Sequence, residues 1–170
     1  KYFGADRFKN KDYYGGSYKN NLGHYDLITE NGQDFIILYM SWDIYTNEIN
    51  WMNKVLKKYP NRKAIIALHR YTRGSEKANT PITDYAGKLI QTNVVAKNPN
   101  VIAVLNGHYS GASMNVMGFD DDKDGVKERT VYEICTDYQS NDQGGAEYVK
   151  LLYFDLKNNK IYVNSYSPYK

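Results

Sequence analysis

The chain has 170 residues and a mass of 19.7 kDa, a length that suits one domain with a sizeable core or a large piece of a bigger one. Apolar residues make up 42% and charged residues 24%, which excludes a disordered tail. The net charge of +3 is too small and too dispersed to indicate nucleic-acid binding, and no run approaches the roughly 20 apolar residues of a membrane-spanning helix. The single cysteine, Cys135, excludes an internal disulfide framework and a cysteine-based zinc cluster.

The N-terminal part of the chain predicts a loop followed by a β-hairpin. Residues 13–24 are rich in Gly, Asn and Tyr without apolar periodicity, so we expect an irregular loop that includes His24. Residues 25–29 and 34–40 resemble strands, and the Glu30-Asn-Gly sequence between them is typical of a hairpin turn. The second run is nearly all apolar, as in a strand covered on both faces.

The middle of the chain predicts alternating helices and strands. Helices are expected over residues 46–59 and 83–95, and each is followed by an apolar strand that ends in a histidine, at 64–69 and 101–108. The last third contains strand-like runs separated by turn sequences, at 113–119, 130–136, 148–155 and 160–166. This order, βαβαβ and then antiparallel hairpins, predicts an α/β protein with a mixed β-sandwich flanked by helices and no domain boundary.

Two of the three histidines, His69 and His108, end consecutive buried strands. Because parallel neighbouring strands would bring both imidazoles to the same sheet edge, and neutral imidazole binds zinc, iron and manganese well, these residues predict a metal site. The alternative is that each histidine only forms a hydrogen bond with a nearby carbonyl. Their equivalent positions, and the glycine before His108 that would permit a tight turn, favour the metal.

These segments together resemble the C-terminal half of the calcineurin-like metallophosphoesterases, of the secreted bacterial type. The resemblance covers nearly the whole chain and rests on the runs 51–60, 64–69, 101–111, 130–139, 144–145, 151–155 and 164–168. It implies that residues 1–170 are a single partial domain, the C-terminal portion of a four-layer fold. It also implies hydrolysis of phosphoesters at a site of two metal ions, Mn, Fe or Zn, and an extracellular or cell-envelope location.

By this resemblance, His69 and His108 would bind one of the two metals. Arg70, directly after His69, could contact a phosphate through fork-like hydrogen bonds, and the alternative is a salt bridge at the rim. The chain departs from the family pattern where Ser110 replaces the second histidine of Gly-His-x-His. The family's early motifs, which supply the bridging aspartate and the catalytic histidine, are absent from the sequence. We therefore expect this segment to be inactive alone, to pair with a missing N-terminal half of the domain, and to self-associate when isolated.

A second candidate site lies in the acidic run of residues 120–128. Asp120, Asp122 and Asp124 alternate before Gly125, and Glu128 follows at the ninth position, an arrangement that suits a short calcium loop. The alternative is a solvated acidic hairpin turn. This run leaves open a second function, in which a catalytically degenerate phosphoesterase-like scaffold serves as a binding or surface module with a structural calcium.

Overall fold

The computed structural model describes residues 2–42, 44–73 and 85–168, and contains two β-sheets and three α-helices within those ranges. The helices are α1 (Thr46–Lys58), α2 (Tyr85–Asn93) and the short α3 (Asp142–Gly145), with 3-10 turns at Ala5–Arg7 and Val95–Lys97. The strands are β1 (Tyr14–Tyr18), β2 (Gly23–Glu30), β3 (Gln33–Met40), β4 (Lys63–Leu68), β5 (Val101–Asn106), β6 (Gly111–Phe119), β7 (Arg129–Asp137), β8 (Val149–Asp155) and β9 (Lys160–Tyr166).

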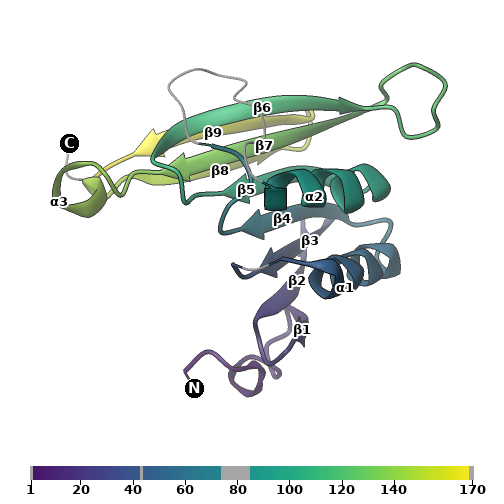
Figure 1. The fold of residues 1–170 in the computed structure, drawn as a ribbon, viewed down its shortest axis with the longest axis horizontal. Coiled ribbons are helices and arrows are strands. Elements are labelled where there is room, and N and C mark those ends of the chain that lie inside the picture. Colours follow the sequence, from purple (N-terminus) through teal and green to yellow (C-terminus); the bar gives the residue numbers. More distant parts are fainter. Residues whose placement is uncertain (1, 43, 74–84, 169–170) are drawn as a thin grey trace.

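The larger sheet has seven strands in the order β1-β2-β3-β4-β5-β7-β6 (Figure 1). Its centre is parallel, because β3, β4, β5 and β7 run in the same direction, and antiparallel pairs flank it on both sides. The predicted βαβαβ order is confirmed by β3-α1-β4-α2-β5, as are the hairpins β6–β7 and β8–β9. The protein is therefore a mixed, β-rich α/β protein, as the sequence indicates.

Helices α1 and α2 cover one face of the parallel strands (Figure 1). The apolar stripe of α1, centred on Met52 and Leu56, packs against Ile36, Leu38 and Ile66 of the sheet, and these side chains have no solvent exposure. A Glu48 side chain in the first turn accepts a hydrogen bond from the Tyr45 backbone and so closes the helix start. This face holds the main core.

The opposite face of the sheet carries the β8–β9 hairpin, a second layer of two strands (Figure 1). Phe154 of the hairpin meets Phe35 of β3 edge-on, with ring centroids 5.5 Å apart, over a small cluster with Ile65 and Ala103. The outward side of the hairpin is left exposed and is largely apolar or aromatic, comprising Val149, Leu151, Tyr153, Tyr162 and Tyr166. Within the described residues, the two sheets face each other over the area of this hairpin.

The expectation of an irregular loop over residues 13–24 is wrong. This segment contains β1 and the start of β2, and His24 lies within β2 with its ring stacked between Tyr14 and Tyr39. The glycines serve close packing here, because a Cβ at Gly15 would lie 2.1 Å from the Tyr25 ring. Glycine in a sequence is typical of a loop, whereas here it lets a strand lie directly on an aromatic side chain.

The second helix differs from its expected range of 83–95. It is described from Tyr85 to Asn93, and a 3-10 turn follows it. Residues 83 and 84 lie outside the described residues. Among the helices of the described ranges, none is long and apolar enough to cross a membrane.

Candidate metal and phosphate site

The imidazoles of His69 and His108 lie together at one edge of the large sheet. His69 directly follows β4 and His108 follows β5, and these neighbouring strands are parallel. The Nε2 atom of His69 is 3.0 Å from the Nδ1 atom of His108. A backbone bond of 3.1 Å from the Gly107 amide to the His69 carbonyl ties the two loops together directly beneath the rings.

Buried polar side chains anchor the loop after β4 to the strands beside it. The Asn106 amide exchanges two hydrogen bonds with Thr72, accepting from the Thr72 backbone amide at 3.2 Å and donating to its hydroxyl at 3.0 Å. Next to this pair, the Tyr71 hydroxyl donates to the carboxylate of Glu133 at 2.7 Å, and both side chains are completely buried. These contacts fix the backbone immediately after His69 and Arg70.

The backbone at His108 is held in a left-handed conformation, with φ of +71°. The tight turn expected at Gly107 thus falls on the histidine itself. Gly107 is needed for a different reason, because a Cβ there would lie 3.3 Å from the Thr136 carbonyl oxygen. The left-handed conformation of His108 is uncommon for a residue with a Cβ, and it aims the imidazole of His108 at His69.

Aromatic rings and guanidinium groups surround the two histidines. The Trp42 ring lies 4.0 Å from the His69 ring and 4.8 Å, edge-on, from the His108 ring, while Tyr109 packs on the other side of His108 at 4.7 Å. Arg70 lies over Trp42 at 5.4 Å, and Arg73 lies over Tyr109 at 5.6 Å. Each guanidinium therefore lies within cation–π distance of a ring that contacts the histidine pair.

The electrostatic environment favours neutral imidazole at His69. Partial burial, together with the charges of His108 and Arg70, lowers the pKa of His69, and the Asp137 carboxylate opposes this shift. The deprotonated ring is the form that binds a metal ion. By contrast, burial and the nearby Asp137 raise the pKa of Cys135 to about 11, so this buried residue is a neutral thiol.

The Nε2 atom of His69 and the Nδ1 atom of His108 lie at hydrogen-bonding distance, 3.0 Å. This is also close to the separation of two nitrogens that bind one ion at about 2.1 Å and at a right angle, whereas a tetrahedral zinc site would hold them about 3.4 Å apart. Within the described ranges, no third histidine, cysteine or carboxylate ligand atom lies within 4.8 Å of both nitrogens. Ser110 forms a hydrogen bond of 2.6 Å with Ser140 instead. A third histidine, cysteine or carboxylate ligand would therefore have to come from outside the described residues.

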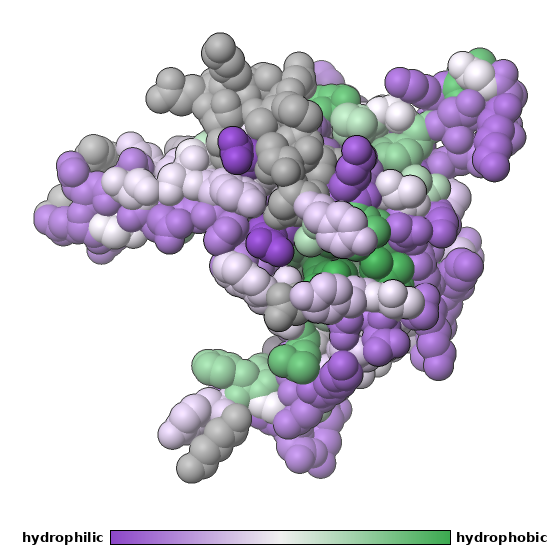
Figure 2. All heavy atoms as spheres, viewed as in Figure 1, coloured by the Kyte–Doolittle hydropathy of each residue, from purple (hydrophilic) through white to green (hydrophobic). Residues whose placement is uncertain are grey.

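The acidic run forms a loop between β6 and β7, and Figure 2 shows it as a mostly hydrophilic lobe at the edge of the molecule. Its side chains converge, since one oxygen from each of Asp120, Asp122, Asp124 and Glu128 lies within 4.8 Å of the others. The same carboxylates accept hydrogen bonds from backbone amides of the loop, such as that of Gly125 to Asp120 at 2.9 Å. Arg129 joins Asp121 through two bonds of 2.7 Å and thereby holds the base of the loop.

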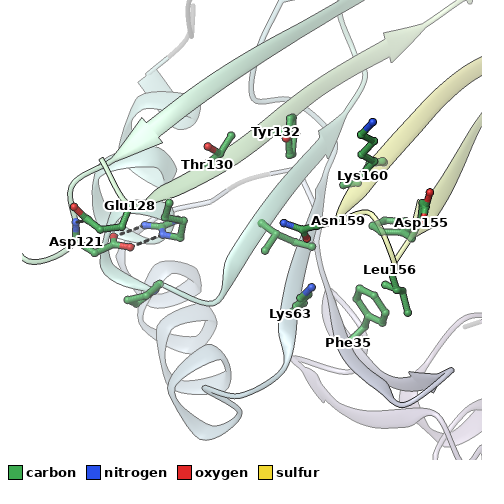
Figure 3. Close-up of a pocket in the computed structure, with 15 residues that line it drawn as sticks. Phe35, Lys63, Asp121, Glu128, Thr130, Tyr132, Asp155, Leu156, Asn159 and Lys160 are labelled. Carbon is green, nitrogen blue, oxygen red and sulfur yellow. Dashed lines mark hydrogen bonds and ion pairs between the residues drawn. The ribbon is translucent and has the colours of Figure 1, made fainter. Parts of the chain in front are cut away.

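A cavity of about 540 Å³ lies at the opposite end of the parallel strands from the histidines (Figure 3). It is bounded by the starts of β3, β4 and β7 and by the β8–β9 turn, with Lys63, Tyr132 and Asn159 among its lining residues. Its lining contains both basic and acidic side chains, and two of these, Arg129 and Asp121, bond to each other.

The sequence reasoning missed several residues of the histidine site. Trp42 follows the carboxyl end of β3 just as His69 follows that of β4, so its position relative to a strand end was the available signal. Arg73 and Asn106 gave no such signal, because their roles depend on ring contacts and on a buried amide that only the folded chain shows.

Comparisons with known proteins give one informative match. No protein-family model matches the sequence. The chain is 50% identical, over 169 residues, to an uncharacterized protein of Bacillus subtilis (strain 168), YvnB. That alignment covers 99% of the chain but only 13% of the relative, so the chain spans a small part of the length of the curated protein that it matches.

Proposed function

We propose that the chain is the C-terminal half of a calcineurin-like metallophosphoesterase domain within a longer polypeptide. The observation that carries this proposal is the convergence of His69 and His108, from neighbouring parallel strands, to a nitrogen–nitrogen distance of 3.0 Å. The fold supports it, because both residues lie at the carboxyl ends of strands, where α/β sheets form their binding sites. The much longer Bacillus relative is consistent with a partial domain.

In this proposal, His69 and His108 hold one metal ion, Mn, Fe or Zn, and the missing N-terminal half supplies the remaining ligands. The ion would polarise the phosphoryl oxygens of a phosphoester and activate water for attack on phosphorus. In this proposal Arg70 binds a non-bridging phosphate oxygen, and the contact of its guanidinium with the Trp42 ring, which touches both histidines, supports this role. Arg73, over the Tyr109 ring, adds a second positive charge near the histidines.

The N-terminal half would cover the surfaces that this chain leaves open. These are the outward side of the β8–β9 hairpin and the sheet face beside it, where Met114 and Val116 of β6 are exposed. An extracellular or cell-envelope location is part of the same proposal.

The test uses the polypeptide at its natural length, with p-nitrophenyl phosphate as substrate and added Mn²⁺ or Zn²⁺. Mutation of a residue that only hydrogen-bonds to a metal ligand lowers metal affinity or activity by about 10–100-fold. Loss of a direct ligand should cost at least as much, so we expect His69→Ala and His108→Ala each to lower metal-dependent turnover by about 100-fold or more. His24→Gln is the matched control, because this third histidine lies in β2 and contacts neither of the others. Equal rates for the wild type and both alanine variants would contradict the proposal.

The acidic loop favours a second candidate, a phosphoesterase-like module that has lost its chemistry and keeps a structural calcium ion. Ser110, bonded to Ser140, supports this reading of the histidine site, and the convergent carboxylates of residues 120–128 support the calcium. Calcium at about 100 times its Kd would stabilise the chain by about 2.7 kcal/mol.

Thermal unfolding with and without calcium tests this candidate. We expect Ca²⁺ to raise the melting temperature of the wild type and not of Asp122→Asn, whereas the exposed Asp142→Asn should respond like the wild type. An unchanged melting temperature of the wild type would exclude a structural calcium in this loop.

A further inference from the structure

A second cavity lies directly beside the histidine pair and shares the Trp42 side chain with it. We call it the Trp42 hollow, and it has a volume of about 450 Å³, within the range of pockets that hold small molecules. Its lining includes Tyr18, Lys19, Leu22, Trp42, Tyr45 and Glu48. Because Trp42 contacts both imidazoles as well, a molecule in the hollow would lie one side chain away from the metal and phosphate site.

The rim of the Trp42 hollow is apolar and unusually open to solvent. Leu22, Trp42 and Tyr45 expose 53%, 44% and 63% of their surfaces, and all three line the same cavity. Single exposed apolar residues are ordinary, whereas several around one concavity indicate a binding surface. Two of the three are aromatic rings, which provide large flat contact areas with little loss of conformational entropy.

The polar side of the hollow is already held in place by internal bonds. Glu48, buried in the first turn of α1, accepts hydrogen bonds from the Tyr18 hydroxyl at 2.8 Å and from the Lys19 ammonium at 3.4 Å. The Lys19 ammonium also lies over the Tyr18 ring at 4.9 Å. This arrangement places hydrogen-bonding groups at the edge of an aromatic cavity.

We infer that the Trp42 hollow binds a planar, heteroaromatic ring of about the size of a purine. As a statement about substrate, it rests on the proposed function: the ester would carry its phosphoryl group to the histidines and its ring to the hollow. The aromatic rim provides flat contacts for the ring, and the Lys19 ammonium donates to acceptors on the ring's edge. An aliphatic alcohol could accept a hydrogen bond from Lys19 but would make no flat contact with the aromatic rim.

The experiment measures binding of a probe that has no phosphate, in the absence of metal. Its result therefore tests the hollow alone and does not depend on whether the phosphoesterase proposal is correct. Adenosine is the probe, and ribose, which lacks the ring, is its matched control. Tryptophan fluorescence is recorded in a Trp51→Phe background, so that the signal comes from Trp42 alone. We expect adenosine to quench Trp42 with saturation and ribose to leave the signal unchanged.

Variants assign the binding to the hollow. Base–aromatic stacking contributes about 1–3 kcal/mol, so Tyr45→Leu should raise the Kd for adenosine about tenfold. Asp142→Asn, at an exposed residue of α3 outside the hollow, should leave that Kd unchanged. Saturation-transfer NMR of the wild type repeats the measurement without the Trp51 substitution and should show transfer to the base protons. Absence of adenosine binding in both measurements, equal binding of ribose, or a Kd unaffected by Tyr45→Leu would each overturn the inference.

Discussion

The Tyr71 hydroxyl donates a 2.7 Å hydrogen bond to Glu133, and neither side chain has any solvent exposure. Glu133 also accepts bonds from Gln91 of α2 and from Asn115 of β6, so one carboxylate joins a helix, two strands and the loop that carries His69. In water this carboxylate would be fully hydrated, and here protein donors replace the water. The network therefore links the core of the protein to its candidate site.

We expect Tyr71→Phe to lower the free energy of unfolding by about 1–3 kcal/mol, because Glu133 would lose a donor while remaining buried. Urea denaturation measures this change. Tyr2→Phe is the control, since Tyr2 is 69% exposed, and it should have no measurable effect. Equal stability of the two variants would show that the Glu133 carboxylate does not depend on the Tyr71 hydroxyl.

The left-handed backbone at His108 predicts an unusual order of stability among variants. Glycine adopts a φ of +71° without the steric penalty of a Cβ, so His108→Gly should be more stable than His108→Ala by about 1 kcal/mol. At a strand end with a negative φ, the alanine variant would be more stable than the glycine variant. Chemical denaturation of both variants decides between these orders, and a more stable alanine variant would show that the backbone relaxes when the imidazole is removed.

We expect the protein to become more stable when the charge of Asp26 is removed. Its Oδ1 atom is buried and accepts no hydrogen bond from the residues that the structure describes, and burial raises the pKa of Asp26, opposed by the charge of His24. Asp26→Asn should therefore raise the free energy of unfolding at pH 7 by about 1 kcal/mol.

The sign of the pH dependence follows from the raised pKa. The folded chain binds a proton at Asp26 more readily than the unfolded chain, whose pKa is about 3.9. The gain in free energy of unfolding of Asp26→Asn over the wild type is thus complete above the pKa of Asp26 in the folded chain. It disappears as the pH falls from that pKa to the pKa in the unfolded chain. Denaturation at several pH values checks this, with the exposed Asp12→Asn as control. An advantage that grew as the pH fell would contradict the assignment.

The open face of the β8–β9 hairpin predicts self-association of the isolated chain. The apolar side chains on its outward side, such as Leu151 and Tyr153, have no partner layer within the described ranges. In sedimentation-velocity experiments, the sedimentation coefficient of the chain should rise with protein concentration. Leu151→Lys should reduce this rise and Asn50→Lys, on the exposed side of α1, should not. A monomer at all concentrations would argue against an uncovered interface.

The central part of the fold could be predicted from the sequence because its signals are local. The spacing of Met52 and Leu56 in α1, and the apolar runs of β4 and β5, specify buried elements whatever surrounds them. The parallel pairing of β4 with β5 follows from the helix between them, and it places His69 and His108 at one edge.

The remainder depends on contacts between distant residues. Gly15 resembles a loop residue until the Tyr25 ring is seen lying against it, and this contact converts the expected loop into β1. Trp42, isolated in sequence from both histidines, becomes their neighbour only through the order of three strands in the sheet. The reciprocal bonds of Asn106 and Thr72 span 34 residues, and no periodicity indicates them.

The backbone bond between Gly107 and His69, with the Asn106–Thr72 pair below it, has a consequence for how a cation would be captured. These bonds hold the backbone at His69, Thr72 and Gly107, so arrival of an ion would not have to organise it, and chelation should remove the ion while the scaffold stays folded. Such a receptor can exchange one metal for another without passing through a disordered state, and its selectivity would rest on ligand geometry and on whichever ion the surroundings supply.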